Sequence, residues 1–180
     1  MDEFVVLRRD PVTNGMCYGV DDEGSPRRIN QTVLQDVIAT WPVAPTTPDN
    51  ILSLLQKSRI AVLCSLAGRE LLMDGVLSAL HAVEAALRQR IEASGESVSN
   101  RHGKPLAWGD LFQRAVSLGL LEREPDDLLD YGRNLRNRLS HPSQVMYLPY
   151  AAALPLIETS HRLVARLYAT GDNLTAATTR

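Results

Sequence analysis

The segment from Tyr131 to Pro142 (YGRNLRNRLSHP) concentrates side chains that can handle a phosphodiester. It holds three arginines, two asparagines, one histidine and no acidic residue. The arginine guanidinium offers a planar fork of N–H donors that matches phosphate oxygens. Histidine exchanges a proton near neutral pH, and asparagine adds a neutral donor and acceptor. These residue types predict a site that holds a phosphodiester and moves a proton beside it.

Spacing limits how these side chains can meet. Arg136 and His141 would point about 140° apart on an unbroken helix. Two arrangements would bring them together: Pro142 ends the helix and lets His141 turn back, or two copies of the chain face each other across a two-fold axis. A simpler interpretation stays open, because cationic side chains at a helix end also satisfy the last carbonyls and suit the helix dipole.

Helices must position this segment. Apolar residues at three- and four-residue steps predict helices over about 29–41, from Pro48 past Ile60, over 68–93, 107–118 and 125–141, and over 149–169 with a kink or restart near Pro155. The apolar stripe of the longest of these consists of Met73, Val76, Leu80, Val83, Leu87 and Ile91.

Helix boundaries are marked by local signals. Thr46 or Thr47 can cap the helix that has Pro48 in its first turn. Ser94-Gly95 ends the long helix, and Gly119 fits the position after the end of the helix 107–118. We therefore expect short, defined connections between these elements.

The N-terminal part differs from the rest. Residues 3–7 and 16–20 are β-like runs separated by an Asn-Gly turn signal, and 21–26 reads as a second turn. The resulting hairpin would either pair with a strand of another protein or cover the helical core. After the proline-rich linker 42–48 the chain becomes helical. The predicted division is a small hairpin-plus-helix segment over 1–45, a helical domain over 46–172 and a frayed tail over 173–180.

Composition excludes several classes of protein. The 180 residues include 44% hydrophobic and 22% charged residues, which suits a globular protein. The formal net charge is −2, so a nucleic-acid role must rest on a local basic patch. The N-terminus lacks the order of a signal peptide, and no apolar run reaches the length of a membrane span. Two distant cysteines make neither a disulfide framework nor a zinc site, so we expect a cytoplasmic protein. Because no apolar run is long enough, we also expect that it does not enter a membrane.

The basic segment resembles a known motif. Asn134–Pro142 is similar to the Arg-Asn-x-x-x-His signature of the HEPN superfamily (higher eukaryotes and prokaryotes nucleotide-binding domain): Arg136 matches its arginine, Asn137 the polar residue that often follows, and His141 its histidine. Residues 79–87 resemble the family's long early helix, and 106–121 resemble the short helix and Gly-Leu exit before the motif helix. The resemblance covers about residues 47–170.

The resemblance implies a mainly α fold: a HEPN-like bundle of four to five helices, here with a small N-terminal β-hairpin. It also implies a homodimer with the motifs at its interface, and a metal-independent endoribonuclease without cofactors, used in toxin–antitoxin or antiviral systems. In that role His141 is the base or acid, Arg136 stabilises charge on the phosphate, and Asn137 positions either group. An antitoxin or other regulatory protein would be a partner. From helix geometry, Arg133 could extend the phosphate contacts of Arg136. Arg138 lies about 160° round the helix from Arg136, so it would reach RNA from another side or be solvated. The alternative is a non-catalytic HEPN-like module that binds or assembles with other proteins.

Other polar residues have two interpretations each. Glu84 borders the apolar stripe of the long helix, where it could orient Arg136 or be a solvated boundary residue. His81 and Glu84 have a spacing that can ligate a metal, but no third ligand is evident, so no metal site is predicted. His102 and His161 are expected to be structural or exposed.

Overall fold

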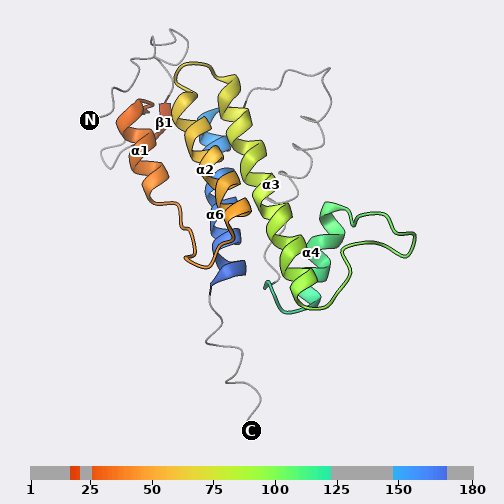
Figure 1. The fold of residues 1–180 in the computed structure, drawn as a ribbon. Coiled ribbons are helices and arrows are strands. Elements are labelled where there is room, and N and C mark those ends of the chain that lie inside the picture. The colour runs from red at the N-terminus through yellow and green to blue at the C-terminus, as the bar shows by residue number, and fades with distance from the viewer. Residues whose placement is uncertain (1–16, 21–25, 123–147, 170–180) are drawn as a thin grey trace.

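The computed structural model describes residues 17–20, 26–122 and 148–169, and this part of the chain is mainly α-helical (Figure 1). Its elements are β1 (Cys17–Val20), β2 (Pro26–Arg28), α1 (Gln31–Ala39), α2 (Asp49–Cys64), α3 (Glu70–Ala93), α4 (Trp108–Ser117) and α6 (Tyr150–Tyr168). The predicted helix over 125–141 and the tail lie outside the described residues. None of the described helices is long and apolar enough to cross a membrane.

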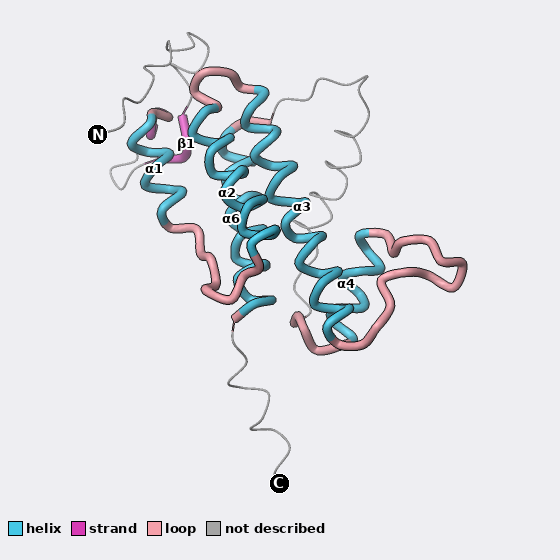
Figure 2. Tube along the Cα trace, in the orientation of Figure 1, coloured by secondary structure: helices cyan, strands magenta, loops and turns pink. Residues whose placement is uncertain are grey.

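The two short strands form an antiparallel pair beside α1 (Figure 2). Cys17 lies opposite Arg28, and Val20 lies opposite Pro26. The predicted strand 16–20 therefore exists, but it pairs with a strand that begins where the predicted second turn ends. Its predicted partner, residues 3–7, lies outside the described part of the chain.

Helix α1 agrees with its predicted pattern. The Oδ1 atom of Asn30 accepts a hydrogen bond of 2.9 Å from the backbone N–H of Val33, which is a standard N-cap. Leu34 and Ile38 are buried, and Val33 is half-buried. The stripe thus packs against the core while the opposite face meets solvent.

Helix α2 differs from the prediction at its N-terminus. Its N-cap is Pro48, and no side chain caps it. The hydroxyl of Thr46 instead donates to the carbonyl of Tyr168 at the end of α6. Ile60, an apolar residue of this helix, is 61% exposed, whereas Ala61 and Val62 are buried. The neighbouring helices decide which face is buried, and a short apolar pattern leaves that choice open.

Helix α3 is the centre of the bundle and contacts α2, α4 and α6. Its predicted apolar stripe is buried throughout, which confirms that prediction. Small residues widen the buried surface beyond the stripe: Gly75, Ser78, Ala79, Ala82 and Ala86 are also buried. Such residues let neighbouring helices come close, so α3 can pack on more than one side.

Glycines end two helices as predicted. Gly95 has φ +80°, and the N–H groups of Gly95 and Glu96 bond to the carbonyls of Glu92 and Ile91 at 2.9 and 3.3 Å. Gly119 has φ +69° and follows α4 with the same pattern. These bonds satisfy carbonyls that the helix leaves unpaired, in a conformation that favours glycine.

Helix α6 runs antiparallel to α2 and is tied to it at both ends. At one end the hydroxyls of Ser65 and Tyr150 lie 2.7 Å apart and share a hydrogen bond. At the other end Thr46 meets Tyr168, whose hydroxyl also donates to Gln89 of α3 at 3.0 Å. Pro155 is exposed, and the helix continues through it without the predicted restart.

Close contact of α2 and α3 at Gly75 yields a test of the packing. A Cβ atom there would lie 3.1 Å from Val62 Cγ2 and 3.2 Å from the carbonyl oxygen of Ser58. We expect Gly75→Val to lower the free energy of unfolding by about 1–3 kcal/mol, because extra volume must push the helices apart. Urea denaturation measures this loss. Ala93→Val, on an exposed position of the same helix, should lose only about 0.5 kcal/mol, and equal losses would contradict the account.

Candidate functional site

Most of the predicted site lies outside the described residues. Arg133, Arg136, Asn137, Arg138 and His141 all belong to residues 123–147, so their mutual arrangement stays a prediction. The described part of the chain contains the one predicted orienting residue, Glu84, and both neighbours of that segment. The described part of the predicted site is therefore Glu84 and its surroundings on α3.

Glu84 is a partly buried residue with a defined partner. Its side chain is 15% exposed, and its Oε1 atom accepts bonds from Arg88 Nε at 3.2 Å and Nη2 at 2.8 Å. Glu84 has a further interaction besides this pair. The carboxylate is thus held in place one turn before Arg88. Glu84 is therefore paired and partly buried, and is more than a solvated boundary residue.

Arg88 joins α3 to the loop that leads to α4. Besides Glu84, its guanidinium donates to the carbonyl of Leu106 at 2.9 Å and to that of Val98 at 3.5 Å. Val98 and Leu106 are on the two sides of the loop, and their backbones are bonded to each other at 2.8 Å. One cation therefore fixes both sides of the loop against the C-terminal half of α3. The spacing Glu84–Arg88, four residues apart on a helix, was a signal in the sequence that could have predicted this pair.

Glu122 and Leu148, the described residues on either side of the segment 123–147, lie toward opposite ends of α3 (Figure 1). Glu122 follows α4, which packs on the C-terminal half of α3 (Figure 1). Leu148 precedes α6, whose first residue contacts Ser65 at the turn between α2 and α3. The predicted motif belongs to the part of the chain between these two residues.

The described residues contain no group of three His, Cys, Asp or Glu side chains that could hold a metal ion. His81 is exposed on α3, and Glu84 is engaged with Arg88. The His81–Glu84 spacing therefore forms no metal site with any third described ligand.

His161 is a buried residue of α6. Its ring is 0% exposed and lies against the indole of Trp41, with ring centroids 5.0 Å apart. Neither ring nitrogen has a hydrogen-bond partner of normal geometry among the described residues. The expectation that His161 is structural or exposed is thus resolved in favour of the structural role.

The surroundings of His161 keep it neutral. Burial lowers its pKa to about 3, the positive charge of Arg59 adds to this shift, and the backbone of Pro42 opposes it weakly. Arg59 is held nearby by a 2.6 Å bond from Nη2 to the carbonyl of Trp41, and burial lowers its pKa as well. This histidine therefore stabilises the core as a neutral ring and is not placed to exchange protons with a ligand.

The Arg88 contacts are testable. Arg88→Met keeps the aliphatic stem but leaves Glu84 and the loop carbonyls without this donor, so we expect a loss of about 1–3 kcal/mol in the free energy of unfolding. Amide hydrogen exchange should accelerate in residues 97–106. The matched control is Arg162→Met, because Arg162 also pairs four residues back on its helix, with Glu158 at 2.6 Å, but is 62% exposed. We expect that control to change stability by less than about 0.5 kcal/mol, and unaltered exchange in Arg88→Met would refute the anchoring role.

Burial of His161 predicts a pH dependence. Its folded-state pKa of about 3 is below the ordinary 6.5, so the stabilisation from the neutral ring is complete above pH 6.5. It is lost as the pH falls from 6.5 towards 3, at about 1.4 kcal/mol per pH unit. Urea denaturation at several pH values from about 7 to about 5 measures the free energy of unfolding. This free energy should fall with that slope in the parent, relative to His161→Leu. The exposed control His81→Gln should retain the parent's slope, and identical slopes for parent and His161→Leu would disprove the neutral buried state.

Comparisons of the chain with known protein families, with characterised proteins and with solved structures find no significant match.

Proposed function

We propose that the chain is a metal-independent endoribonuclease of the HEPN type. It cuts RNA in the cytoplasm as a homodimer, as a toxin or phage-defence effector controlled by an antitoxin or other regulatory protein. The observation that carries this proposal is the order Arg136-Asn137-x-x-x-His141, followed by Pro142, within one acid-free segment. In RNA cleavage without a metal, a guanidinium can stabilise charge on the phosphate and an imidazole can transfer the proton.

The helical layout supports the proposal. A long helix (α3), a short helix (α4) and a final helix (α6) occur in the order that the resemblance implies. The predicted motif falls between α4 and α6, where the family carries it. Fold alone does not establish an activity, so the weight stays with the motif.

Glu84 is the described residue that the proposal assigns to the site. Glu122 and Leu148, on either side of the segment that contains the motif, lie toward opposite ends of α3, and Glu84 lies between those ends (Figure 1). Its carboxylate is partly buried and is held by Arg88. We propose that Glu84 orients Arg136.

The proposed reaction uses the substrate's own nucleophile. The RNA 2′-hydroxyl loses its proton to His141 and attacks the adjacent phosphorus, and the bond to the 5′-oxygen breaks, leaving a 2′,3′-cyclic phosphate and a 5′-hydroxyl. A second proton, delivered to the leaving oxygen by the paired histidine of the dimer, balances the step. Arg136 stabilises the charge on the phosphate, Asn137 positions the reacting groups, and Arg133 and Arg138 bind neighbouring phosphates.

The test is cleavage of mixed-sequence RNA by the purified protein in excess EDTA. We expect the parent to leave 2′,3′-cyclic ends. Arg136→Ala and His141→Ala should each lower the rate by roughly 10²–10⁴-fold, the usual contribution of a positioned acid–base group, without loss of helical circular dichroism. His81→Ala, a change at an exposed histidine of α3, should cleave like the parent.

A folded dimer that cleaves none of several RNAs would contradict the enzyme and favour a non-catalytic binding or assembly module. Equal loss of activity in His81→Ala would show that the assay reports stability. Unchanged cleavage by all three variants would indicate a contaminating nuclease.

A further inference from the structure

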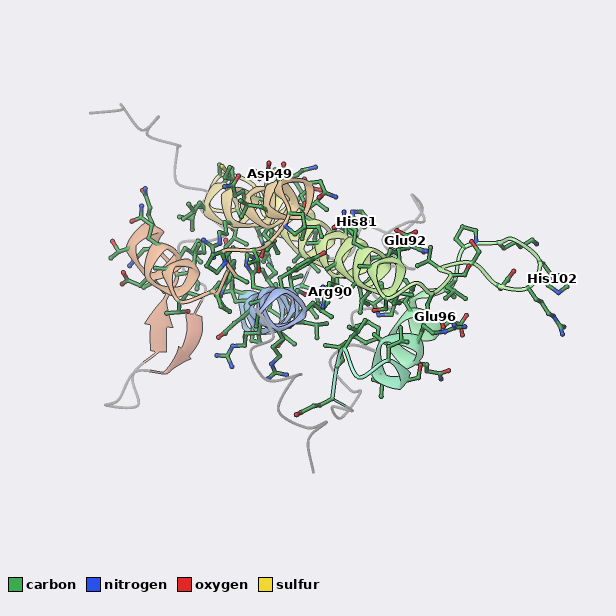
Figure 3. All side chains as sticks on the ribbon, turned by 60° about the horizontal axis from the view of Figure 1, so that its bottom comes forward. Asp49, His81, Arg90, Glu92, Glu96 and His102 are labelled. Carbon is green, nitrogen blue, oxygen red and sulfur yellow. The ribbon has the colours of Figure 1, made fainter. Side chains whose placement is uncertain are left out.

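The loop between α3 and α4 projects from the helical body (Figures 1 and 2). Its two sides meet in an antiparallel bridge between Ser99 and Pro105. Figure 3 shows His102 at the far tip, pointing away from the helices, while Glu96 lies back beside α4. We call residues 100–104 (Asn-Arg-His-Gly-Lys) the tip.

The tip has a fixed backbone. Asn100 Oδ1 accepts hydrogen bonds from the N–H groups of His102 at 2.9 Å and Lys104 at 3.1 Å. The N–H of Asn100 donates to the carbonyl of Lys104 at 2.8 Å, and Gly103 turns the chain with φ +72°. Together with the Arg88 anchor on both sides of the loop, these bonds present the tip in a defined direction.

The tip carries positive charge without nearby compensation. Arg101, His102 and Lys104 are exposed, and the sequence from 97 to 109 contains no acidic residue. None of the ion pairs in the described part of the chain involves Arg101 or Lys104. The acid at the base of the loop, Glu96, is bound by Arg114 at 2.6 Å. A local cationic group thus stands out on a chain of net charge −2.

The neighbouring side chains indicate the kind of partner. Arg101 Nε donates to His102 Nε2 at 3.1 Å, which places the guanidinium of this exposed residue beside an imidazole ring. The exposed tip has no large apolar residue, whereas the centre of a protein interface is usually apolar or aromatic. Phosphate binding needs cations and N–H donors alone, and an exposed ring can also stack on an unpaired base.

We propose that the tip binds the sugar-phosphate backbone of a single-stranded RNA. Arg101 and Lys104 each contact a phosphate, and His102 stacks beside a base. The contact is independent of sequence, and it holds the strand that the proposed site at Arg136 and His141 cuts, so it rests on the proposed function. The anchor Arg88 links this tip to Glu84, the carboxylate proposed to orient Arg136.

The test separates binding from cleavage. The probe is a fluorescent mixed-sequence RNA with a 2′-O-methyl group on every ribose, which removes the nucleophile. Affinity is measured by fluorescence anisotropy for the full chain and for Arg101→Gln/Lys104→Gln at salt concentrations from about 50 to 200 mM. We expect the variant to bind on the order of tenfold more weakly at about 0.1 M salt. The slope of log affinity against log salt should be less steep by about 1.4, because single strands contribute about 0.7 per phosphate contact.

The matched control is Lys57→Gln/Arg162→Gln, which makes the same change of charge at exposed positions of α2 and α6. It should bind the probe like the parent. Equal weakening in the control would attribute binding to net charge, and parent-like binding by the tip variant would overturn the proposal. Tip-dependent binding of a poly-glutamate peptide with no binding of RNA would overturn it in favour of an acidic protein partner.

The two proposals fail separately. Tip-dependent binding of the uncleavable probe by a protein that never cleaves RNA would leave the tip proposal standing and remove the enzyme. Cleavage that depends on His141, with RNA binding unaffected by the tip variant, would support the enzyme and remove the tip proposal.

Discussion

The burial of α3 is the constraint on which the rest of the described fold depends. A helix of 24 residues that is covered by α2, α4 and α6 must present small side chains wherever a neighbour comes close. Gly75 and the buried alanines do this, while the larger residues of the stripe fill the remaining space. Burial of apolar surface contributes about 25 cal/mol per Å², so this central helix stabilises every element packed on it. The connections then only have to lead the chain from one side of α3 to the next.

Polar contacts set how the neighbours sit on that helix. Ser65 with Tyr150 and Thr46 with Tyr168 hold α6 along α2 at both ends. Where α4 packs on α3, Arg88 has a similar role, because it donates hydrogen bonds to both sides of the α3–α4 loop. Because apolar packing has little direction, such bonds select one arrangement among several with similar burial. The bonds from Arg88 also fix the base of the cationic tip against the C-terminal half of α3.

The histidines of the described chain divide according to their surroundings. His161 lies in the core against Trp41, near the charge of Arg59, and stays neutral there. His81 and His102 meet solvent, the first on α3 and the second at the loop tip. Proton exchange with a ligand requires access, so burial excludes His161 from chemistry despite its residue type. The proposed chemistry therefore depends on His141.

Local signals in the sequence determined the helices, the glycines that end α3 and α4, and the apolar stripe of α3. Each of these depends on neighbours a few residues away, through hydrogen bonds and periodicity. The sequence also displays the Arg136–His141 motif, but its spacing leaves open how the side chains meet. Tertiary packing decided the exposure of Ile60, the bond from Thr46 to Tyr168, the pairing of β1 with β2, and the links from Arg88 to the loop. It also buried His161. These outcomes depend on residues distant in the chain, because the free energy of burial and of charge is set by what packs against a side chain.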